Sequence, residues 1–403
     1  MRRIIAAFFL FSLGFSTFHN VQAQTVINVT GFSVSYHFGQ EIDVKANLSA
    51  AAPITDVTIL FRAQGEATTR SDHVTLNPDG SLDYRYAFAQ GPLRSFARVD
   101  FWFHVTLQTG EQVDTSTSYF YYNDDRFPWQ MVEQDGIRVH WYAGDEGFAR
   151  QALDAARTGI QQMSPILAAA PAYPIDLYIY AASADLQSAL EIGGETWSNG
   201  HASPDLCVAL VTITPGLDQS VSIDREIPHE LAHLLTYQLV GQQYSTLPVW
   251  LREGIASMAE SANPDYPRAI TLAAGQQALI PLADLCGSFP ADLSRVTLAY
   301  AESESFTQFI VDKYGNSGLQ ALIRAYADGL DCQQGPARAL GTPLAGLETA
   351  WLGSAPGGAN PAAAAVTGLF PYLALMALIV IVPLAFVAAV WRRPNGPGQP
   401  AQK

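Results

Sequence analysis

The stretch that decides the fold is residues 227–233, Ile-Pro-His-Glu-Leu-Ala-His. On an α-helix, side chains four positions apart share a face, so His229 and His233 can offer two imidazole nitrogens to one metal ion. Glu230 lies about 100° further round the helix axis, where it can reach a water molecule held by that metal. The pattern predicts a Zn²⁺ site on one helix, with Glu230 as the general base.

A third metal ligand is predicted from residues 248–256, Pro-Val-Trp-Leu-Arg-Glu-Gly-Ile-Ala. Glu253 stands twenty residues after His233, which allows the first helix to end and a second helix to bring Glu253 back to the metal. Catalytic zinc commonly has three protein ligands and one open position. It lowers the pKa of its water to about 7, and a carboxylate can then pass the proton to the departing amine. We therefore expect His229, His233 and Glu253 as zinc ligands of a hydrolytic site.

These two stretches, followed by residues 299–303, Ala-Tyr-Ala-Glu-Ser, resemble the peptidase MA-like family, a group of gluzincins whose best-known member is thermolysin. The resemblance covers roughly residues 137–351, and the first two stretches carry most of it. It implies an α+β zincin-like metallopeptidase domain and a peptide or protein substrate. It does not imply a particular physiological substrate.

The sequence departs from the thermolysin pattern at Ser257. Thermolysin-like enzymes carry an acid there, four residues after the ligand glutamate, which orients a ligand histidine; Glu260 is a substitute to consider. The chain also lacks the Gly-x-Met-Glu-Asn run with which zinc aminopeptidases hold a free N-terminus, which favours an endopeptidase. Tyr300 is the candidate for stabilising the oxyanion, with a packed helix tyrosine as the alternative reading, and His201 is a weaker candidate.

The N-terminal part of the chain has a β pattern. Between about Thr25 and Asp125, short runs rich in Val, Ile, Thr, Phe and Tyr alternate with polar residues and turn signals. The fold class expected for the whole chain is therefore multidomain, with an immunoglobulin- or fibronectin-like β-sandwich over 24–125 and the zincin-like domain over 130–352. An aromatic stripe within residues 101–122 is expected to be sandwich core, with a ligand platform as the alternative.

The two ends of the chain predict membrane targeting. Residues 1–23 read as a secretory signal peptide, with an uncleaved anchor as the alternative. Residues 353–368 read as a Gly/Ala/Pro stalk, and 369–391 as a transmembrane helix because the run is apolar and uncharged. Residues 392–403 then form a cytoplasmic tail by the positive-inside rule. We expect a single-pass type I membrane protein with its peptidase domain on the extracytoplasmic side.

The net charge limits the classes of partner that we expect, and the cysteines predict one disulfide. The formal net charge is −15, so we expect no nucleic-acid partner, because the acidic surface would repel its phosphates. Of the three cysteines, Cys286 and Cys332 stand in loop-like contexts and are favoured as a disulfide pair, whereas Cys207 is expected to be a free thiol. The oligomeric state stays open.

Two function classes remain after these observations. The first is a membrane-anchored zinc metallopeptidase. The second is a surface binding or adhesion protein that acts through the β-sandwich and whose zinc domain is weakly active or inactive. The presence of Glu230 favours the first class, because a purely structural zinc site has no use for a general base.

Overall fold

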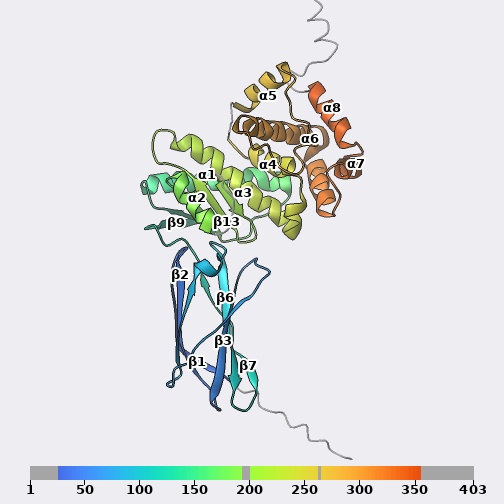
Figure 1. Cartoon of the computed structure of the whole chain (residues 1–403). Helices are drawn as coiled ribbons and strands as arrows, with labels where there is room; N and C mark the ends of the chain where they lie inside the picture. Colours follow the sequence, from blue (N-terminus) through green and yellow to red (C-terminus); the bar gives the residue numbers. More distant parts are fainter. Residues whose placement is uncertain (1–25, 193–199, 262–264, 355–403) are drawn as a thin grey trace, which may run out of the picture. The chain divides into compact units, whose positions relative to one another are not determined.

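The computed structural model describes residues 26–192, 200–261 and 265–354. By its internal contacts the chain divides into two compact units, Met1–Asp124 and Asp125–Lys403 (Figure 1). In the described residues the first unit contains two β-sheets and the second contains one.

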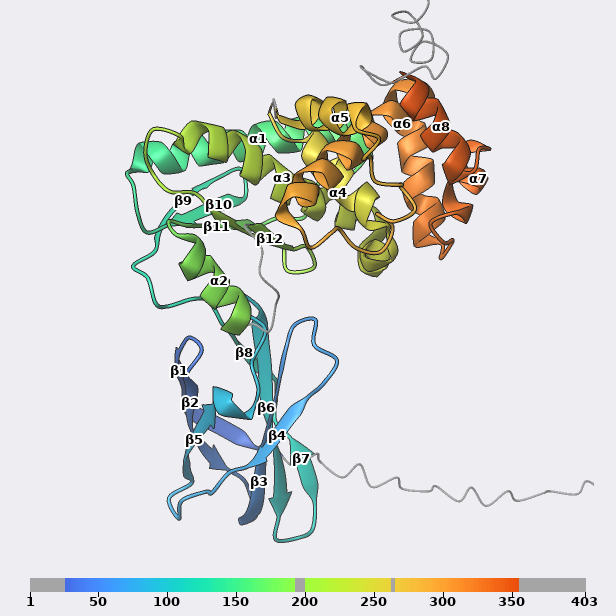
Figure 2. The same ribbon diagram turned by 45° about the horizontal axis from the view of Figure 1, so that its top comes forward.

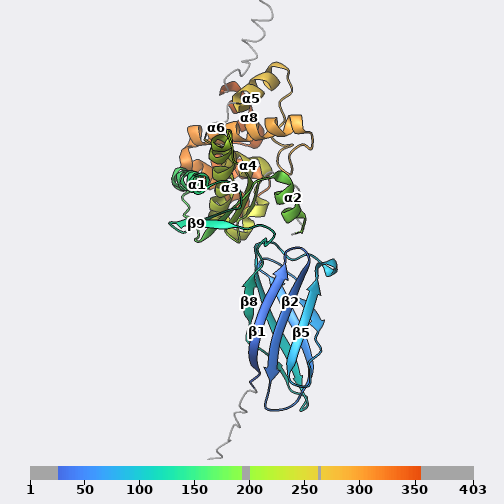
Figure 3. The ribbon, with the colours of Figure 1, turned by 90° about the vertical axis from the view of Figure 1, so that its left-hand side faces the viewer.

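The first unit is built from two antiparallel sheets (Figure 3). One has the strand order β1-β2-β5, and the other has the order β4-β3-β6-β7 with β8 also paired to β6. The strands are β1 (Asn28–His37), β2 (Glu41–Ser49), β3 (Ile54–Ala63), β4 (Arg70–His73), β5 (Ser81–Ala87), β6 (Arg98–Leu107), β7 (Gln112–Asp114) and β8 (Ser118–Tyr121), and a short 3₁₀ helix, η1, spans Phe88–Gln90. The β-rich N-terminal region thus fits the predicted fold class.

Alternation of buried and exposed residues places the core of this unit between its sheets. Every second residue of β6 is buried, and the ring of Phe61 in one sheet lies 4.9 Å from that of Tyr86 in the other. The aromatic stripe is divided: Phe101 and its neighbours in the core are buried, whereas Tyr119 and Tyr121 are exposed. The expectation of a sandwich core therefore holds for only part of the stripe.

The second unit begins with a mixed sheet of order β12-β13-β11-β10-β9. The three central strands, β10 (Ile137–Trp141), β11 (Ile175–Tyr180) and β13 (Val208–Thr212), run parallel. The edge strands β9 (Gln130–Gln134) and β12 (Gly200–Ser203) are antiparallel to their neighbours. Central strands of this kind are apolar because both faces are covered.

Helices cover both faces of this sheet (Figure 2). Buried residues of α1 (Glu146–Leu167) and α3 (Gln219–Val240) form one core with alternate residues of β10, β11 and β13. The opposite face is covered by α2 (Ser183–Ile192). Asp145 caps α1 by accepting a hydrogen bond from the amide of Phe148 at 2.9 Å.

A helical half follows, with its own core. It comprises η2 (Gly241–Thr246), α4 (Val249–Met258), α5 (Asp265–Gly275), α6 (Leu293–Ala327), α7 (Gln334–Leu340) and α8 (Leu344–Ser354). Trp250, Phe306 and Trp351 are almost fully buried at its centre. The sequence pattern predicts separate helices near 297–314 and 318–327, and an interruption at Gly315, with φ 70°, divides α6 between them.

The sequence predicts that the motif helix starts near Asp224 or Arg225, with Pro228 in or near its first turn. In the structure α3 starts at Gln219, so Pro228 lies in its interior. Proline has no N–H, so the carbonyl of Asp224 lacks its usual partner within the helix. The amide of Ser261, just after α4, donates to that carbonyl at 3.0 Å. On the other side, a Cβ on Gly159 of α1 would lie 2.9 Å from the Pro228 ring, so only glycine allows this approach. Pro228 thus helps to fix α3 against both α1 and α4.

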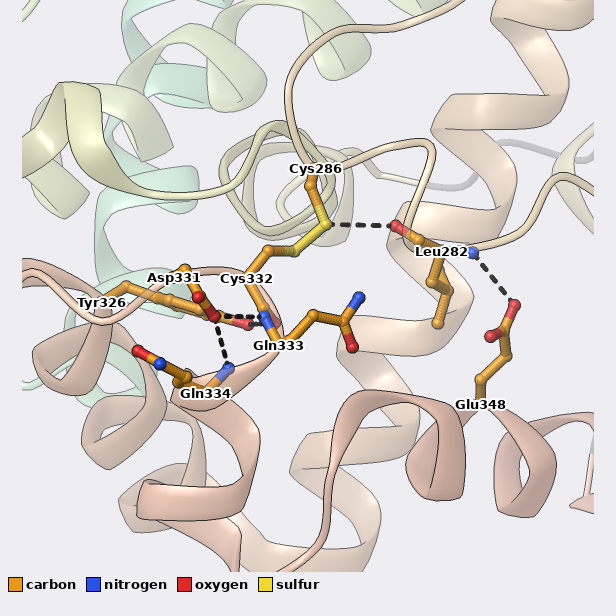
Figure 4. Close-up of a disulfide and its surroundings, with 8 residues drawn as sticks. All are labelled: Leu282, Cys286, Tyr326, Asp331, Cys332, Gln333, Gln334 and Glu348. Atoms are coloured by element: carbon orange, nitrogen blue, oxygen red, sulfur yellow. Dashed lines mark hydrogen bonds between the residues drawn. A yellow bond between two sulfur atoms is a disulfide. The ribbon is translucent and has the colours of Figure 1, made fainter.

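The predicted disulfide is confirmed. Cys286, in the segment between α5 and α6, is bonded to Cys332, which follows α6 (Figure 4). Glu348 of α8 holds the same segment by accepting a hydrogen bond from the amide of Leu282 at 3.0 Å. Cys207 is a free, half-buried thiol, as expected, but it stands in a turn before β13 with φ 56° and not within a strand.

The prediction of a C-terminal transmembrane helix is wrong. A membrane span needs about 20 predominantly apolar residues, and among the residues that the structure describes no helix is long and apolar enough to qualify. Even α6, the longest, carries Glu302, Asp312 and Arg324 along its length. The predicted single-pass type I membrane location is therefore not supported either. The residues assigned to the signal peptide, the transmembrane helix and the tail lie outside the described residues.

Candidate metal centre

Three predicted ligands converge between α3 and α4. The Nε2 atoms of His229 and His233 lie 3.6 and 3.7 Å from the same carboxylate oxygen of Glu253. One ligand atom from each of the three residues lies within 4.8 Å of the others. Two ligand atoms of a tetrahedral Zn²⁺ with bonds near 2.0–2.1 Å are separated by about 3.3 Å, so the spacing fits such an ion after a small adjustment.

The outer nitrogen of His229 is held by Glu260. Its Nδ1 lies 3.0 Å from Oε1 of Glu260, whose side chain is almost fully buried just after α4. The hydroxyl of Tyr266 donates to the same oxygen at 3.2 Å. A carboxylate on Nδ1 keeps the proton on that nitrogen and leaves Nε2 free for a metal. Thermolysin-like enzymes place an orienting acid at the position that Ser257 occupies here, and Ser257 is buried. Glu260 therefore takes this orienting role.

The outer nitrogen of His233 has a partner that is not predicted from the sequence. The hydroxyl oxygen of Tyr244, in η2, lies 2.8 Å from its Nδ1. With the ring proton on Nδ1, the phenol oxygen accepts it and Nε2 again faces Glu253. Both histidines are thus oriented from behind, one by a carboxylate and one by a phenol. Tyr244 is part of no sequence motif. The conformation of η2 brings it to His233, and no fixed spacing along the chain marks it.

The general-base candidate, Glu230, is buried beside the edge strand β12. A Cβ on Gly200, the first residue of β12, would collide with Oε1 of Glu230. Gly200 therefore leaves the space in which this carboxylate lies. A glycine before His201 was visible in the sequence, but only the fold brings it to Glu230.

The helix that presents Glu253 is held at its N-terminal end and along its side. The amides of Val249 and Trp250 donate to the carbonyls of Cys286 and Leu285, both at 3.0 Å, so the disulfide-bonded segment satisfies the first turn of α4. Next to Glu253, a Cβ on Gly254 would collide with Thr307 and with the Ser303 carbonyl of α6. Gly254 thus permits the close packing of α4 on α6.

Burial and charge set the protonation of the four central groups. Burial raises the pKa of Glu230 to about 8 and lowers the pKa of His233 to about 4. Burial also opposes ionisation of Glu253, but the two histidines outweigh it and lower its pKa to about 2. For His229, burial is outweighed by Glu253 and Glu260, which raise its pKa well above the usual value. A cation at the site would reverse the effects on Glu230 and His229, because it favours the carboxylate and displaces the proton of a ligand histidine.

The two oxyanion candidates lie on separate elements. Tyr300 of α6 is within the site: its ring is 6.0 Å from that of His229 and packs edge-on against Phe289 at 4.9 Å. Burial and the charges of Glu253 and Glu230 raise its pKa, so the phenol keeps its proton. His201 of β12 lies near enough for its charge to lower the pKa of His233, and its Nε2 is 3.3 Å from the hydroxyl oxygen of Ser203.

The donor set suits zinc. Two imidazoles and one carboxylate are a common ligand set of catalytic Zn²⁺. Glu253 ionised and His233 neutral is the protonation state that a metal requires of its ligands. In the described residues this is also the one group of three or more His, Cys, Asp or Glu side chains that could hold a metal ion.

Comparison with known protein families supports the assignment of this domain to a peptidase superfamily. A family model described as the peptidase MA superfamily matches residues 155–355, which confirms the resemblance inferred from the motif. No curated protein sequence matches the chain.

Solved structures give weak likenesses. An aminopeptidase A from Legionella pneumophila in complex with aspartic acid is 10% identical, covers 81% of this chain and 49% of its own, and has a TM-score of 0.40. A carbohydrate-binding module of family 56, a β-1,3-glucan binding domain, is 14% identical, covers 23% of this chain and 98% of its own, and has a TM-score of 0.17. OgpA from Akkermansia muciniphila is 12% identical, covers 24% of this chain and 28% of its own, and has a TM-score of 0.20. These likenesses assign no function to this chain. The metal-centre motif and the family match together place residues 155–355 of this chain in the peptidase MA superfamily.

Proposed function

We propose that this peptidase-superfamily domain is a zinc-dependent peptidase that hydrolyses peptide bonds with Glu230 as general base. The observation that carries the proposal is the convergence of two Nε2 atoms and one carboxylate oxygen, while Glu260 and Tyr244 hold the opposite nitrogens of the two rings. A site that only braced the fold would not need Glu230, an ionisable group buried next to the ligands.

In this proposal, different residues hold the metal, transfer the proton and stabilise the oxyanion. His229, His233 and Glu253 would hold Zn²⁺, which supplies Lewis acidity toward a substrate carbonyl and lowers the pKa of water. Glu230 would take a proton from the attacking water and deliver it to the nitrogen of the departing amine. Tyr300, which keeps its proton, would donate a hydrogen bond to the oxyanion that develops on the scissile carbonyl.

An internal peptide bond is the proposed target. The chain has no Gly-x-Met-Glu-Asn run to hold a free amino terminus. The edge strand β12 lies beside Glu230, so an extended peptide or protein segment could pair with it without a free end. This arrangement supports an endopeptidase.

The test uses the zinc-loaded protein and a degenerate peptide library, with cleavage followed by mass spectrometry. Wild type should cleave the library, a chelator should stop cleavage, and Glu230→Gln should lose at least about 10²-fold in kcat because one proton-transfer group is removed. Glu230→Gln should keep its zinc by elemental analysis. Cleavage that persists in Glu230→Gln would contradict the role of this residue. Binding of no zinc by wild type would contradict the ligand assignment.

A further inference from the structure

Arg252 stands immediately before the ligand Glu253 on α4 and has no carboxylate partner. Some arginines of the described residues pair with acids, as Arg138 does with Asp176 and Arg157 with Asp135. Arg252 makes no ion pair within the part of the chain that the structure describes, although this chain has 37 acidic residues. An unpaired arginine beside a metal centre needs a physical reason.

The surroundings of Arg252 place it in the candidate site. Its guanidinium carbon lies 5.4 Å from the centre of the Tyr244 ring, and the Tyr244 hydroxyl is the group that contacts His233. Its Nε is buried without a hydrogen-bond partner, while the residue as a whole is neither buried nor fully exposed. The buried Nε thus has no hydrogen-bond partner, while part of the residue is exposed to solvent.

The charge of Arg252 is costly where it lies. A guanidinium is permanently ionised, and burying any part of it without an anion is unfavourable. The stacked Tyr244 ring and the nearby Glu253 carboxylate offset some of this cost. Once Glu253 is shared with a divalent cation, that cation and the guanidinium repel each other. An incoming anion would relieve this repulsion.

We propose that Arg252 binds a carboxylate of the peptide substrate close to the scissile bond and thereby selects peptides that carry one there. This inference rests on the proposed peptidase function and deepens it. The planar fork of a guanidinium matches the two oxygens of a carboxylate, and such a hydrogen bond is stronger than one between neutral groups. The carboxylate can belong to an Asp or Glu side chain or to the C-terminus of the peptide, and the test separates these two sources.

The experiment uses four pools of one degenerate nonapeptide. Its central residue is Glu or Gln, and its C-terminus is a free acid or an amide. With zinc-loaded wild type, kcat/KM should be at least about tenfold higher for the pool that carries the recognised carboxylate than for its neutral counterpart. Preference for the Glu pools would assign the side chain, whereas preference for the free acids would assign the C-terminus.

Arg252→Gln should reduce this ratio to about one, mainly through KM. Arg252→Lys should keep a smaller preference, because the charge remains but the fork is lost. The matched control is Arg268→Gln, which removes an exposed arginine from α5 and should leave the ratio unchanged. If Arg252 only held Tyr244 in place, Arg252→Gln would slow acidic and neutral pools by the same factor, and that result would overturn the proposal.

A binding measurement separates this proposal from the peptidase assignment. The affinities of the four pools for Glu230→Gln and for Glu230→Gln/Arg252→Gln are compared by calorimetry. Selective binding of a carboxylate pool that depends on Arg252, in a protein whose wild type cleaves nothing, would support the subsite and contradict the peptidase function. Equal binding of all four pools to Glu230→Gln would contradict the subsite whatever wild type hydrolyses.

Discussion

The hydroxyl oxygen of Tyr244 lies 2.8 Å from Nδ1 of His233, on the side of the ring opposite the nitrogen that faces Glu253. This contact joins η2, the turn after α3, to the face of α3 that carries the candidate metal ligands. Two candidate metal ligands from one helix are therefore held by groups from two later segments, since Glu260 after α4 contacts the outer nitrogen of His229.

Loss of the Tyr244 hydroxyl should weaken metal binding. Tyr244→Phe keeps the ring but leaves Nδ1 of His233 without its acceptor, and loss of such a contact typically lowers metal affinity by about 10–100-fold. Zinc affinity measured by competition with a chelator checks this. Tyr237→Phe is the matched control, because that hydroxyl accepts from Gln242 at the exposed end of α3. Equal affinities of Tyr244→Phe and wild type would contradict the orienting role.

Neutralising Glu260 should also lower zinc affinity, again by about 10–100-fold. Glu260→Gln keeps the size of the side chain but removes the charge that holds the proton on Nδ1 of His229. Chelator competition checks the loss, with Glu146→Gln, an exposed residue of α1, as control. An unchanged affinity would mean that Glu260 does not act through His229.

A methyl group on Gly200 should impair catalysis and leave zinc binding in place. The added Cβ of Gly200→Ala would collide with the Glu230 carboxylate, and displacement of a reacting group by about 1 Å can cost about 10²-fold in rate. Steady-state kinetics on a cleaved library peptide, together with elemental analysis, tests this. Gly275→Ala, at a position with open space, should change neither quantity. Full activity of Gly200→Ala would show that Glu230 does not work from its observed position.

Removal of the disulfide should lower stability and loosen α4. The bond closes a loop of 46 residues, for which chain entropy gives about 4 kcal/mol of stabilisation. Denaturant unfolding of Cys286→Ser/Cys332→Ser should show a loss of this order. Because the carbonyl of Cys286 accepts from the first turn of α4, zinc affinity should fall too. Cys207→Ser should change stability much less, and a zinc affinity equal to wild type in the double variant would separate the disulfide from the metal centre.

The buried carboxyl of Glu302 should make stability fall as pH rises. Burial raises its pKa to about 8, although the amide of Ile280 donates to it. Between the unfolded pKa near 4.5 and about 8, the folded protein holds a proton that the unfolded chain has lost, so the free energy of unfolding decreases across this window. Glu302→Gln mimics the protonated form, and its free energy of unfolding should decline less than that of wild type between pH 5 and 8. Parallel pH profiles of the two proteins would contradict the raised pKa.

The local pattern of the chain was enough to predict much of the second unit. The apolar run predicts a strand at Ile175–Tyr180, and β11 has these bounds. The helices that the sequence predicts at 146–168 and near 249–259 correspond to α1 and α4, each of which ends one residue earlier. The start of α3 was misjudged because Pro228 usually marks a first turn, and only the long-range contact from Ser261 to Asp224 makes its interior position acceptable. The transmembrane prediction rested on composition alone and is contradicted by the helices that the structure describes.

By itself, the sequence determined the candidate metal ligands of the first helix and their spacing, because His229 and His233 share a helix face by a local rule of geometry. It also determined the candidate general base and the superfamily of residues 155–355, since short contiguous stretches of sequence carry both signals. Only the tertiary structure decided what supports these groups: Tyr244 and Glu260 behind the histidines, Gly200 beside Glu230 and Arg252 without an anion. These relations join separate elements, and the distance between such elements follows from packing and chain reversal, which no local spacing encodes.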